Sequence, residues 1–168
     1  MKLTRFITML FAAAIFAVLT SPVPVPAADA MDKSTMDKTI FLNPDDLHWD
    51  NAPPSLPQGA KMAVLLGDPS KAGIFVIRFQ APGAYTIPPH YHSRAETLTV
   101  LSGTLYLGGG ETFDPPSSHA LEVGGFHYLP AKSPHFAFSK APVIVEIHGE
   151  GPFDIIYMNP ADDPLKAR

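Results

Sequence analysis

Two histidines one residue apart, His90 and His92, are the residues from which the chemistry of this chain can first be inferred. If the backbone is extended there, both side chains point to the same face, because side chains alternate along a strand. Glu96 follows after a short turn, and His135 comes after a second segment marked by glycine and proline. Imidazole nitrogen and carboxylate oxygen are suitable ligands for a divalent first-row metal. The pattern therefore predicts one metal centre with these four side chains as ligands.

Two further ionisable residues, Glu146 and His148, are candidate catalytic residues beside this centre. They share one face of the predicted strand 143–148 with Ile144, while the other face carries only valine and isoleucine. Facing inward, either side chain would act as a general acid or base next to the metal. Facing outward, both would be solvated surface residues, and the sequence leaves the two orientations open.

The spacing of the predicted ligands resembles the two motifs of the cupin family. The first motif, glycine, His-x-His, glutamate and glycine, is found within 83–103, with six residues rather than the usual five before His90. The second is found within 124–139, with Lys132 in place of a glycine and Ser139 in place of an asparagine. If the turn requires a positive φ, a lysine costs about 1–2 kcal/mol there. None of these departures removes a ligand.

Composition and turn signals predict an all-β protein. Nineteen prolines and twelve glycines in 168 residues argue against a helical bundle, and 46% hydrophobic residues argue against a disordered chain. Short apolar or alternating runs separated by turn residues are typical of a β-sandwich or barrel. The expected strands are 39–42, 61–66, 74–80, 84–87, 96–101, 104–107, 119–123, 126–129, one that begins at His135, 143–148 and 153–158. The resemblance narrows this to a single cupin jelly-roll (double-stranded β-helix) barrel.

The N-terminus predicts export. Two basic residues precede an apolar run, 6–20, and the segment ends in Ala28-Asp29-Ala30. This order matches a secretory signal peptide, and the run is short for a membrane span. We expect a signal peptide over 1–30 and one cupin domain with an irregular N-terminal arm over 31–168, periplasmic or secreted. An uncleaved membrane anchor is the alternative.

Charge limits the classes of partner. The formal net charge is −4 and the chain has no basic cluster, so nucleic acid and anionic membrane surfaces are poor candidates. The absence of cysteine excludes disulfides, thiolate ligands and a cysteine nucleophile. The expected partner is a small-molecule substrate or ligand. Homodimers are common among cupins, so a second copy of the chain is also a candidate partner.

Three histidines and a glutamate leave one or two coordination positions open on a divalent iron, manganese, nickel, copper or zinc ion. The sequence has no nucleotide or flavin motif and no evident nucleophile triad, so the metal is the only visible source of chemistry. The chain resembles exported bacterial single-domain cupins, most of which have no assigned reaction. The resemblance implies a metal-dependent enzyme, first a dioxygenase-like oxidoreductase and next an isomerase or lyase. The alternative is a non-catalytic cupin that binds or senses a metal or small ligand.

Overall fold

The computed structural model of the protein describes residues 38–166. The predicted signal peptide and its cleavage site lie outside the described residues. Among residues 38–166, no helix has the length and apolar character needed to cross a membrane.

Strands are the main secondary structure of the described chain, and the only helical elements in it are single turns of 3-10 helix. The 3-10 turns are Pro44–Asp46, Pro115–Ser117 and Pro160–Asp162. The strands are β1 (Asp50–Asn51), β2 (Lys61–Leu66), β3 (Gly73–Ala81), β4 (Tyr85–Tyr91), β5 (Glu96–Ser102), β6 (Leu105–Gly109), β7 (His119–Leu121), β8 (Phe126–Leu129), β9 (His135–Ser139), β10 (Val143–Gly151) and β11 (Ile156–Tyr157).

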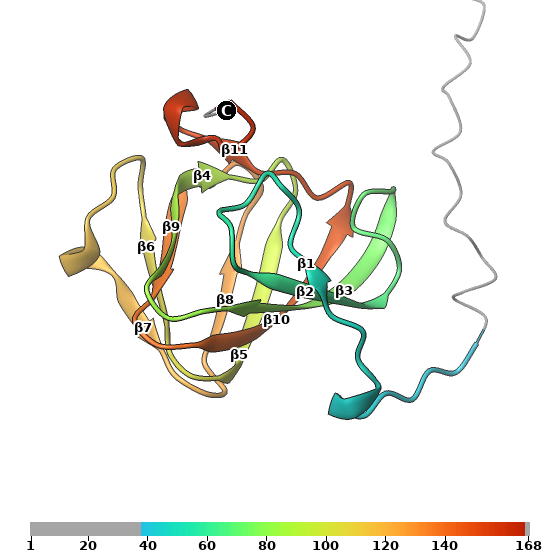
Figure 1. Cartoon of the computed structure of the whole chain (residues 1–168). Coiled ribbons are helices and arrows are strands. Elements are labelled where there is room, and N and C mark those ends of the chain that lie inside the picture. The colour runs from blue at the N-terminus through green and yellow to red at the C-terminus, as the bar shows by residue number, and fades with distance from the viewer. Residues whose placement is uncertain (1–37, 167–168) are drawn as a thin grey trace, which may run out of the picture.

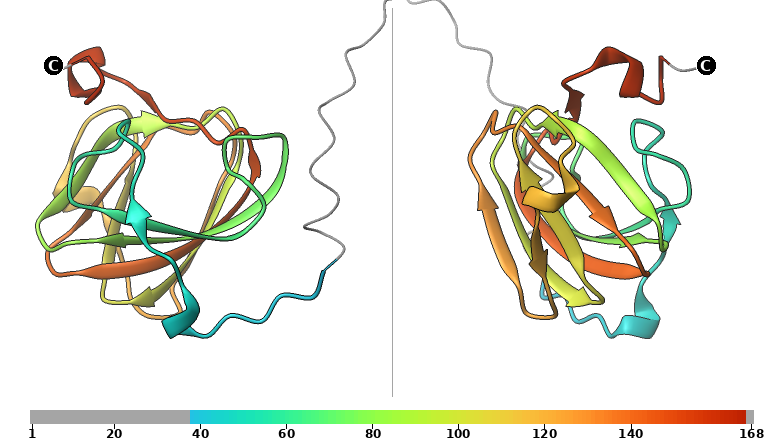
Figure 2. Two further views of the ribbon diagram at one scale, coloured as in Figure 1. Left: turned by 45° about the vertical axis from the view of Figure 1, so that its right-hand side comes forward. Right: turned by 90° about the vertical axis from the view of Figure 1, so that its left-hand side faces the viewer.

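The strands form two antiparallel sheets that face each other and enclose the interior of a barrel (Figures 1 and 2). The six-stranded sheet has the order β1-β2-β3-β10-β5-β8, and the five-stranded sheet has the order β11-β4-β9-β6-β7. Some neighbours are consecutive in sequence, as in β2 and β3, whereas others are far apart, as in β3 and β10 or β4 and β9. The predicted all-β jelly-roll barrel is confirmed.

Alternation of apolar side chains explains why the central strands pack as they do. In β10, Val143, Val145 and Ile147 are buried, whereas the residues between them are less so. Val145 pairs with Phe79 on one side and Val100 on the other, so apolar side chains meet in rows across the sheet. Burial of this face away from water is the main favourable contribution to folding.

The outer face of the five-stranded sheet has a small aromatic cluster of its own. Phe136, on β9, is fully buried there, and Phe113 from the loop before the second 3-10 turn packs against it with ring centroids 4.9 Å apart. Gly108 on the adjacent strand makes room for the ring, because a Cβ there would lie 2.1 Å from it. With Phe136 fixed on the outer face, its neighbours His135 and Ala137 point into the barrel.

Two of the predicted strands differ from the structure. The predicted strand 39–42 is wrong, because this segment is exposed and irregular, with Phe41 89% exposed. Nothing in the sequence of a four-residue apolar run shows whether a neighbouring strand is available to pair with it. The predicted strand 153–158 is reduced to β11, residues Ile156–Tyr157.

Candidate metal centre

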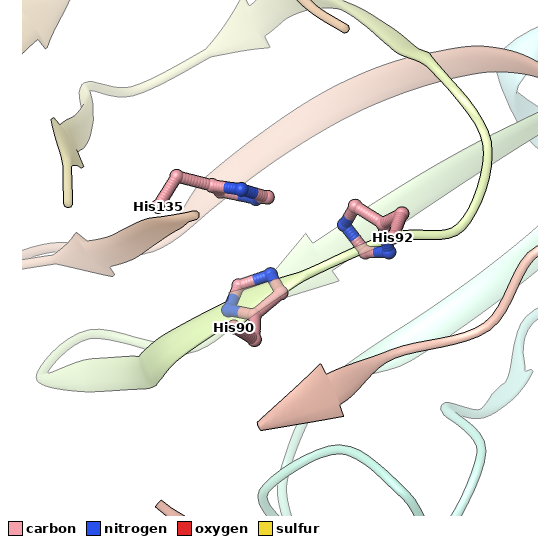
Figure 3. Close-up of side chains that lie close together, drawn as sticks. All are labelled: His90, His92 and His135. Atoms are coloured by element: carbon pink, nitrogen blue, oxygen red, sulfur yellow. The ribbon is translucent and has the colours of Figure 1, made fainter. Parts of the chain in front are cut away.

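Three histidines converge inside one end of the barrel (Figure 3). His90 lies on β4 and His92 just after it, while His135 begins β9 and pairs directly with His90 in the sheet register. The ring centroids are 4.2 Å apart for His90 and His135, and 5.1 Å apart for His90 and His92. All three side chains are buried.

A bend in β4 brings the histidine pair to this position. The pairing of β4 with β9 shifts register between Ile87 and His90, where Pro88 and Pro89 interrupt the ladder. Proline has no backbone N–H to donate, so a pair of prolines favours such an irregularity. At this irregularity the carbonyl oxygen of Pro88 accepts a hydrogen bond from Nδ1 of His90, 2.7 Å away.

Hydrogen bonds fix which nitrogen of each imidazole is available. Nδ1 of His135 donates to the carbonyl two residues before it, at 3.0 Å, as His90 does, and Nδ1 of His92 donates to the carbonyl of Asp154. A carbonyl oxygen only accepts, so each Nδ1 carries the proton and each Nε2 keeps a free lone pair. The ligand atoms of the three rings lie within 4.8 Å of one another. Donation from Nδ1 to a carbonyl is the usual way in which a metal-binding histidine is oriented.

The carboxylate of Glu96 lies beside the three imidazoles. Glu96 begins β5 and points inward, and its Oε2 is 3.8 Å from Nε2 of His135 and 4.0 Å from Nε2 of His92. The structure therefore brings the four predicted ligand residues to one place. The histidines form the tight cluster, and Glu96 borders it; the four-ligand assignment remains a prediction.

The charges of these groups suit a cation. Burial lowers the pKa of His90 to about 3 and also lowers that of His135, so both rings are neutral near pH 7. Burial alone would raise the pKa of Glu96, but a hydrogen bond from His127 and the neighbouring histidines outweigh it and lower that pKa to about 2. One buried negative charge thus lies beside the neutral rings of His90 and His135. This donor set fits a divalent metal, and the histidine triad is positioned to bind one.

The triad opens onto a cavity of about 440 Å³ inside the barrel. Its wall is mostly apolar and includes Ile77, Phe79, Leu98, Leu107, Val145 and Ile147. Segments at the mouth add two serines, Ser55 and Ser70, and the carboxylate-bearing Asp154. This volume lies within the range of small-molecule sites in proteins.

A family model described as a cupin domain matches residues 77–146, which contain the four predicted ligands. The chain belongs to the cupin superfamily. No curated protein matches this cupin in sequence.

Solved structures of similar fold are remote in sequence. The polyketide cyclase RemF from Streptomyces resistomycificus has a TM-score of 0.63 and 14% identity, over 76% of this chain and 90% of that one. A proposed acetylacetone dioxygenase from Methylibium petroleiphilum PM1 has a TM-score of 0.59 and 18% identity, over 76% and 85%. An RmlC-like cupin from Ralstonia eutropha JMP134 has a TM-score of 0.56 and 19% identity, over 75% and 76%. At this identity the likeness shows the fold.

Sequence reasoning missed one residue of the cupin site, His127. It is buried on β8, and its Nε2 lies 3.2 Å from Oε2 of Glu96. The alternation of β8 could have revealed it. His127 lies between two residues, Phe126 and Tyr128, that point to the opposite face of the strand and are exposed. It was not predicted because it is not one of the four ligand positions of the two motifs.

Glu146 and His148 are not at the cavity, which corrects the expectation that they act beside the metal. Both lie on the outer face of the six-stranded sheet, since valine and isoleucine occupy the inward positions of β10. Glu146 accepts a hydrogen bond from Nε of Arg78 at 2.9 Å, and Nε2 of His148 lies 3.1 Å from its other oxygen. The side chain of His148 is 49% exposed. These groups belong to the surface.

Lys132 adopts the strained conformation that its position in the second motif implies. Its φ is +61°, in the left-handed region where glycine is favoured. Its backbone N–H donates to the carbonyl of His92 at 2.8 Å, which ties the turn before His135 to the histidine pair. The turn is thus kept without glycine, at a cost of about 1–2 kcal/mol.

Proposed function

We propose that this cupin is a metal-dependent enzyme that acts on a small molecule, with a dioxygenase-like oxidoreductase as the leading reaction class. The observation that carries the proposal is the set of three imidazole Nε2 lone pairs that converge at the wall of a mostly apolar cavity. A structural metal site normally has all its positions filled by the protein, whereas this one opens to space for a ligand.

The residues around such a centre would have three separate roles: metal binding, charge compensation and exclusion of water. A bound divalent metal supplies Lewis acidity and open positions for oxygen donors. His90, His92 and His135 would hold it, and Glu96 would supply the negative charge that offsets part of the metal's charge. The apolar wall excludes water and strengthens electrostatic interactions at the site.

The surroundings of the triad favour redox chemistry over isomerisation or elimination. Those reactions usually need a separate acid or base aimed at the substrate. Glu146 and His148 are outside the cavity, and the carboxylate of Asp154 is already bonded to the backbone N–H and hydroxyl of Ser93 at 2.8 and 2.7 Å. His127 lines the cavity, but its Nε2 is already directed at Glu96, 3.2 Å away. A reaction in which the metal does most of the chemistry needs no further group. Two similar structures are named a polyketide cyclase and a proposed acetylacetone dioxygenase, which is consistent with a small organic substrate.

Metal analysis and oxygen dependence test the proposal. The protein loaded separately with iron, manganese, nickel, copper or zinc is assayed with a panel of oxygen-bearing small molecules, with and without O₂. We expect turnover with at least one redox-active metal only in O₂, and loss of metal and turnover in the His90→Ala/His135→Ala double variant. His148→Ala, on the outer face, is the matched control and should keep both. Equal turnover without O₂ would favour a lyase or isomerase, and binding without any turnover would favour a binding or sensing cupin.

We also propose that the protein is exported and cleaved near Met31. The support is the charged start, the apolar run and the Ala28-Asp29-Ala30 segment. Mass spectrometry of protein recovered from outside the cytoplasm should give an N-terminus close to Met31. An intact N-terminal Met1 on that protein would overturn the proposal.

A further inference from the structure

The part of the cavity wall that the structure describes contains no permanent cation that could form an ion pair with an anion on a bound molecule. Among the described residues, no lysine or arginine lines it, and its ionisable groups are histidines and the carboxylates of Glu96 and Asp154. Arg78, on β3, points to the outer face, where its side chain pairs with Glu146. Arg94, in the turn before β5, is 46% exposed and lies 3.9 Å from Glu150. A negatively charged group in the cavity would lose its hydration without gaining a partner.

The ionisable groups of the cavity lie at one end. The triad and Glu96 are level with the start of β5, where Glu96 pairs with Gly149. Farther along the same strands the inward pairs are Leu98 with Ile147 and Val100 with Val145, all apolar. A molecule in the cavity therefore meets a polar end at the triad and an apolar environment for the rest of its length.

We propose that the substrate of this cupin is an uncharged, largely apolar molecule whose polar atoms are oxygen donors confined to the end placed at the triad. This inference rests on the proposed function for the role of the metal, and it adds the chemical class of the ligand. It excludes molecules with a carboxylate, phosphate or sulfonate away from the reacting end, and it excludes sugars, whose hydroxyls would lose hydration against the apolar wall.

A matched pair of probes tests the class without any turnover. 4-Methylcatechol and 3,4-dihydroxybenzoate have the same two hydroxyls, and they differ at the far end in a methyl group or a carboxylate. Calorimetry with the zinc-loaded protein should show 4-methylcatechol binding at least ~10-fold more tightly, because the carboxylate would be buried unpaired. Equal or tighter binding of 3,4-dihydroxybenzoate would overturn the inference, even if the protein proves to be a metal-dependent enzyme.

Two variants locate the effect in the cavity. Met62 on β2 lines the cavity and is partly buried, whereas Val64 on the same strand is exposed and does not line it. Met62→Lys should reduce the preference for 4-methylcatechol or reverse it, because the new ammonium can pair with the carboxylate. Val64→Lys should leave the preference unchanged. An equal effect of the two lysines would show that overall charge, and not the cavity wall, determines the selectivity.

A second, independent observation concerns His127. Its Nδ1 is the one buried side-chain nitrogen or oxygen atom without a hydrogen-bond partner among the described residues. Its Nε2 approaches Oε2 of Glu96, the same oxygen that lies 3.8 Å from His135 and 4.0 Å from His92. An ionised carboxylate only accepts hydrogen bonds, so Nε2 carries the proton and donates it.

We infer that His127 is a positioning residue that holds the Glu96 oxygen toward the triad. A carboxylate at the end of a flexible side chain has several rotamers, and a donor from β8 selects the one that points to the imidazoles. Loss of such a hydrogen bond typically costs about 10–100-fold in metal affinity.

Conservative and non-conservative substitutions separate positioning from packing. The amide nitrogen of glutamine reaches about as far as Nε2 of histidine, so His127→Gln should keep zinc affinity within ~3-fold, whereas His127→Leu should lose ~10–100-fold. Zinc affinity is measured by competition with a chelator, and thermal unfolding of the metal-free variants shows whether each one folds. Unchanged affinity in a folded His127→Leu protein, or an equal loss in both variants, would overturn the inference.

Discussion

Two histidine–glutamate pairs lie on opposite faces of the same sheet. Glu96 and His127 approach to 3.2 Å inside the barrel, and Glu146 and His148 approach to 3.1 Å on its outer face. The inner side chains are 7% and 8% exposed, whereas the outer ones are 20% and 49% exposed. The chemical groups and their separation are the same, so any difference in what they do comes from their surroundings.

The surroundings differ in where the balancing positive charge comes from. The outer carboxylate has Arg78 beside it, a cation from the neighbouring strand β3. The inner carboxylate lies beside the triad, in which burial keeps His90 and His135 neutral, and the cavity wall contributes no lysine or arginine among the described residues. The negative charge of the outer pair is balanced by a cation of the protein itself. The negative charge of the inner pair can be balanced by a bound metal cation in the cavity.

The largest expected difference between the pairs is in metal affinity. Glu96→Gln removes the buried negative charge and should weaken zinc binding by about 100-fold or more. Glu146→Gln is the matched change on the outer face and should alter it by less than ~3-fold. Both affinities are measured by chelator competition. Similar losses in the two variants would show that the inner carboxylate has no special relation to the triad.

The pH dependence of stability should also differ between the faces. Burial places the pKa of His90 at about 3 in the folded state, below its ordinary 6.5, so the unfolded state takes up the proton first as pH falls. The stability contribution is therefore present above pH ~6.5 and is lost as pH falls toward 3. For His90 this amounts to about 2 kcal/mol between pH 7 and pH 5.

Chemical denaturation of the metal-free protein at several pH values measures this loss. His90→Gln should make the decline shallower, because glutamine does not titrate. His148→Gln, with an exposed ring, is the control and should leave the decline as it is. An identical decline in all three proteins would place its cause elsewhere in the chain.

The smallest expected effect concerns the outer ion pair itself. Arg78 and Glu146 are 24% and 20% exposed, and partly exposed pairs of this kind contribute about 0.2–1 kcal/mol. Glu146→Gln should lower the free energy of unfolding by that amount, and added salt should reduce the difference between the variant and the parent. A decrease of several kcal/mol in the free energy of unfolding would mean that the outer pair stabilises the fold more than its exposure suggests.

Local spacing indicated an all-β sandwich or barrel and placed the four candidate ligand residues close together, and the family resemblance narrowed the fold to the barrel that the structure shows. Two-residue alternation placed His90 and His92 on one face, and the motif spacing placed Glu96 and His135 near them. The same alternation did not show which face of β10 points into the barrel. Ile144 shares the polar face, so apolar residues appear on both sides of that strand, and only its pairing with β3 and β5 decides which side is inward.

Other features depend on contacts that a sequence does not display. His127 is a single inward residue of a four-residue strand, and its partner is 31 positions away. The positive φ at Lys132 was expected only if the family turn was kept, and the structure shows that it is. The exposed segment 39–42 has the composition of a strand, but among the described residues it has no partner strand.

The hydrogen bond from His92 to the carbonyl of Asp154 bears on the order in which the site is completed. The side chain of Asp154 also holds Ser93, so the loop after the histidine pair is fastened to a segment about 60 residues later. A nascent chain that ends before Asp154 has all four predicted ligands but lacks the group that orients one of them. The orientation of His92 therefore depends on the segment after β10, and a purified fragment that ends near residue 150 should bind zinc less tightly than the full protein.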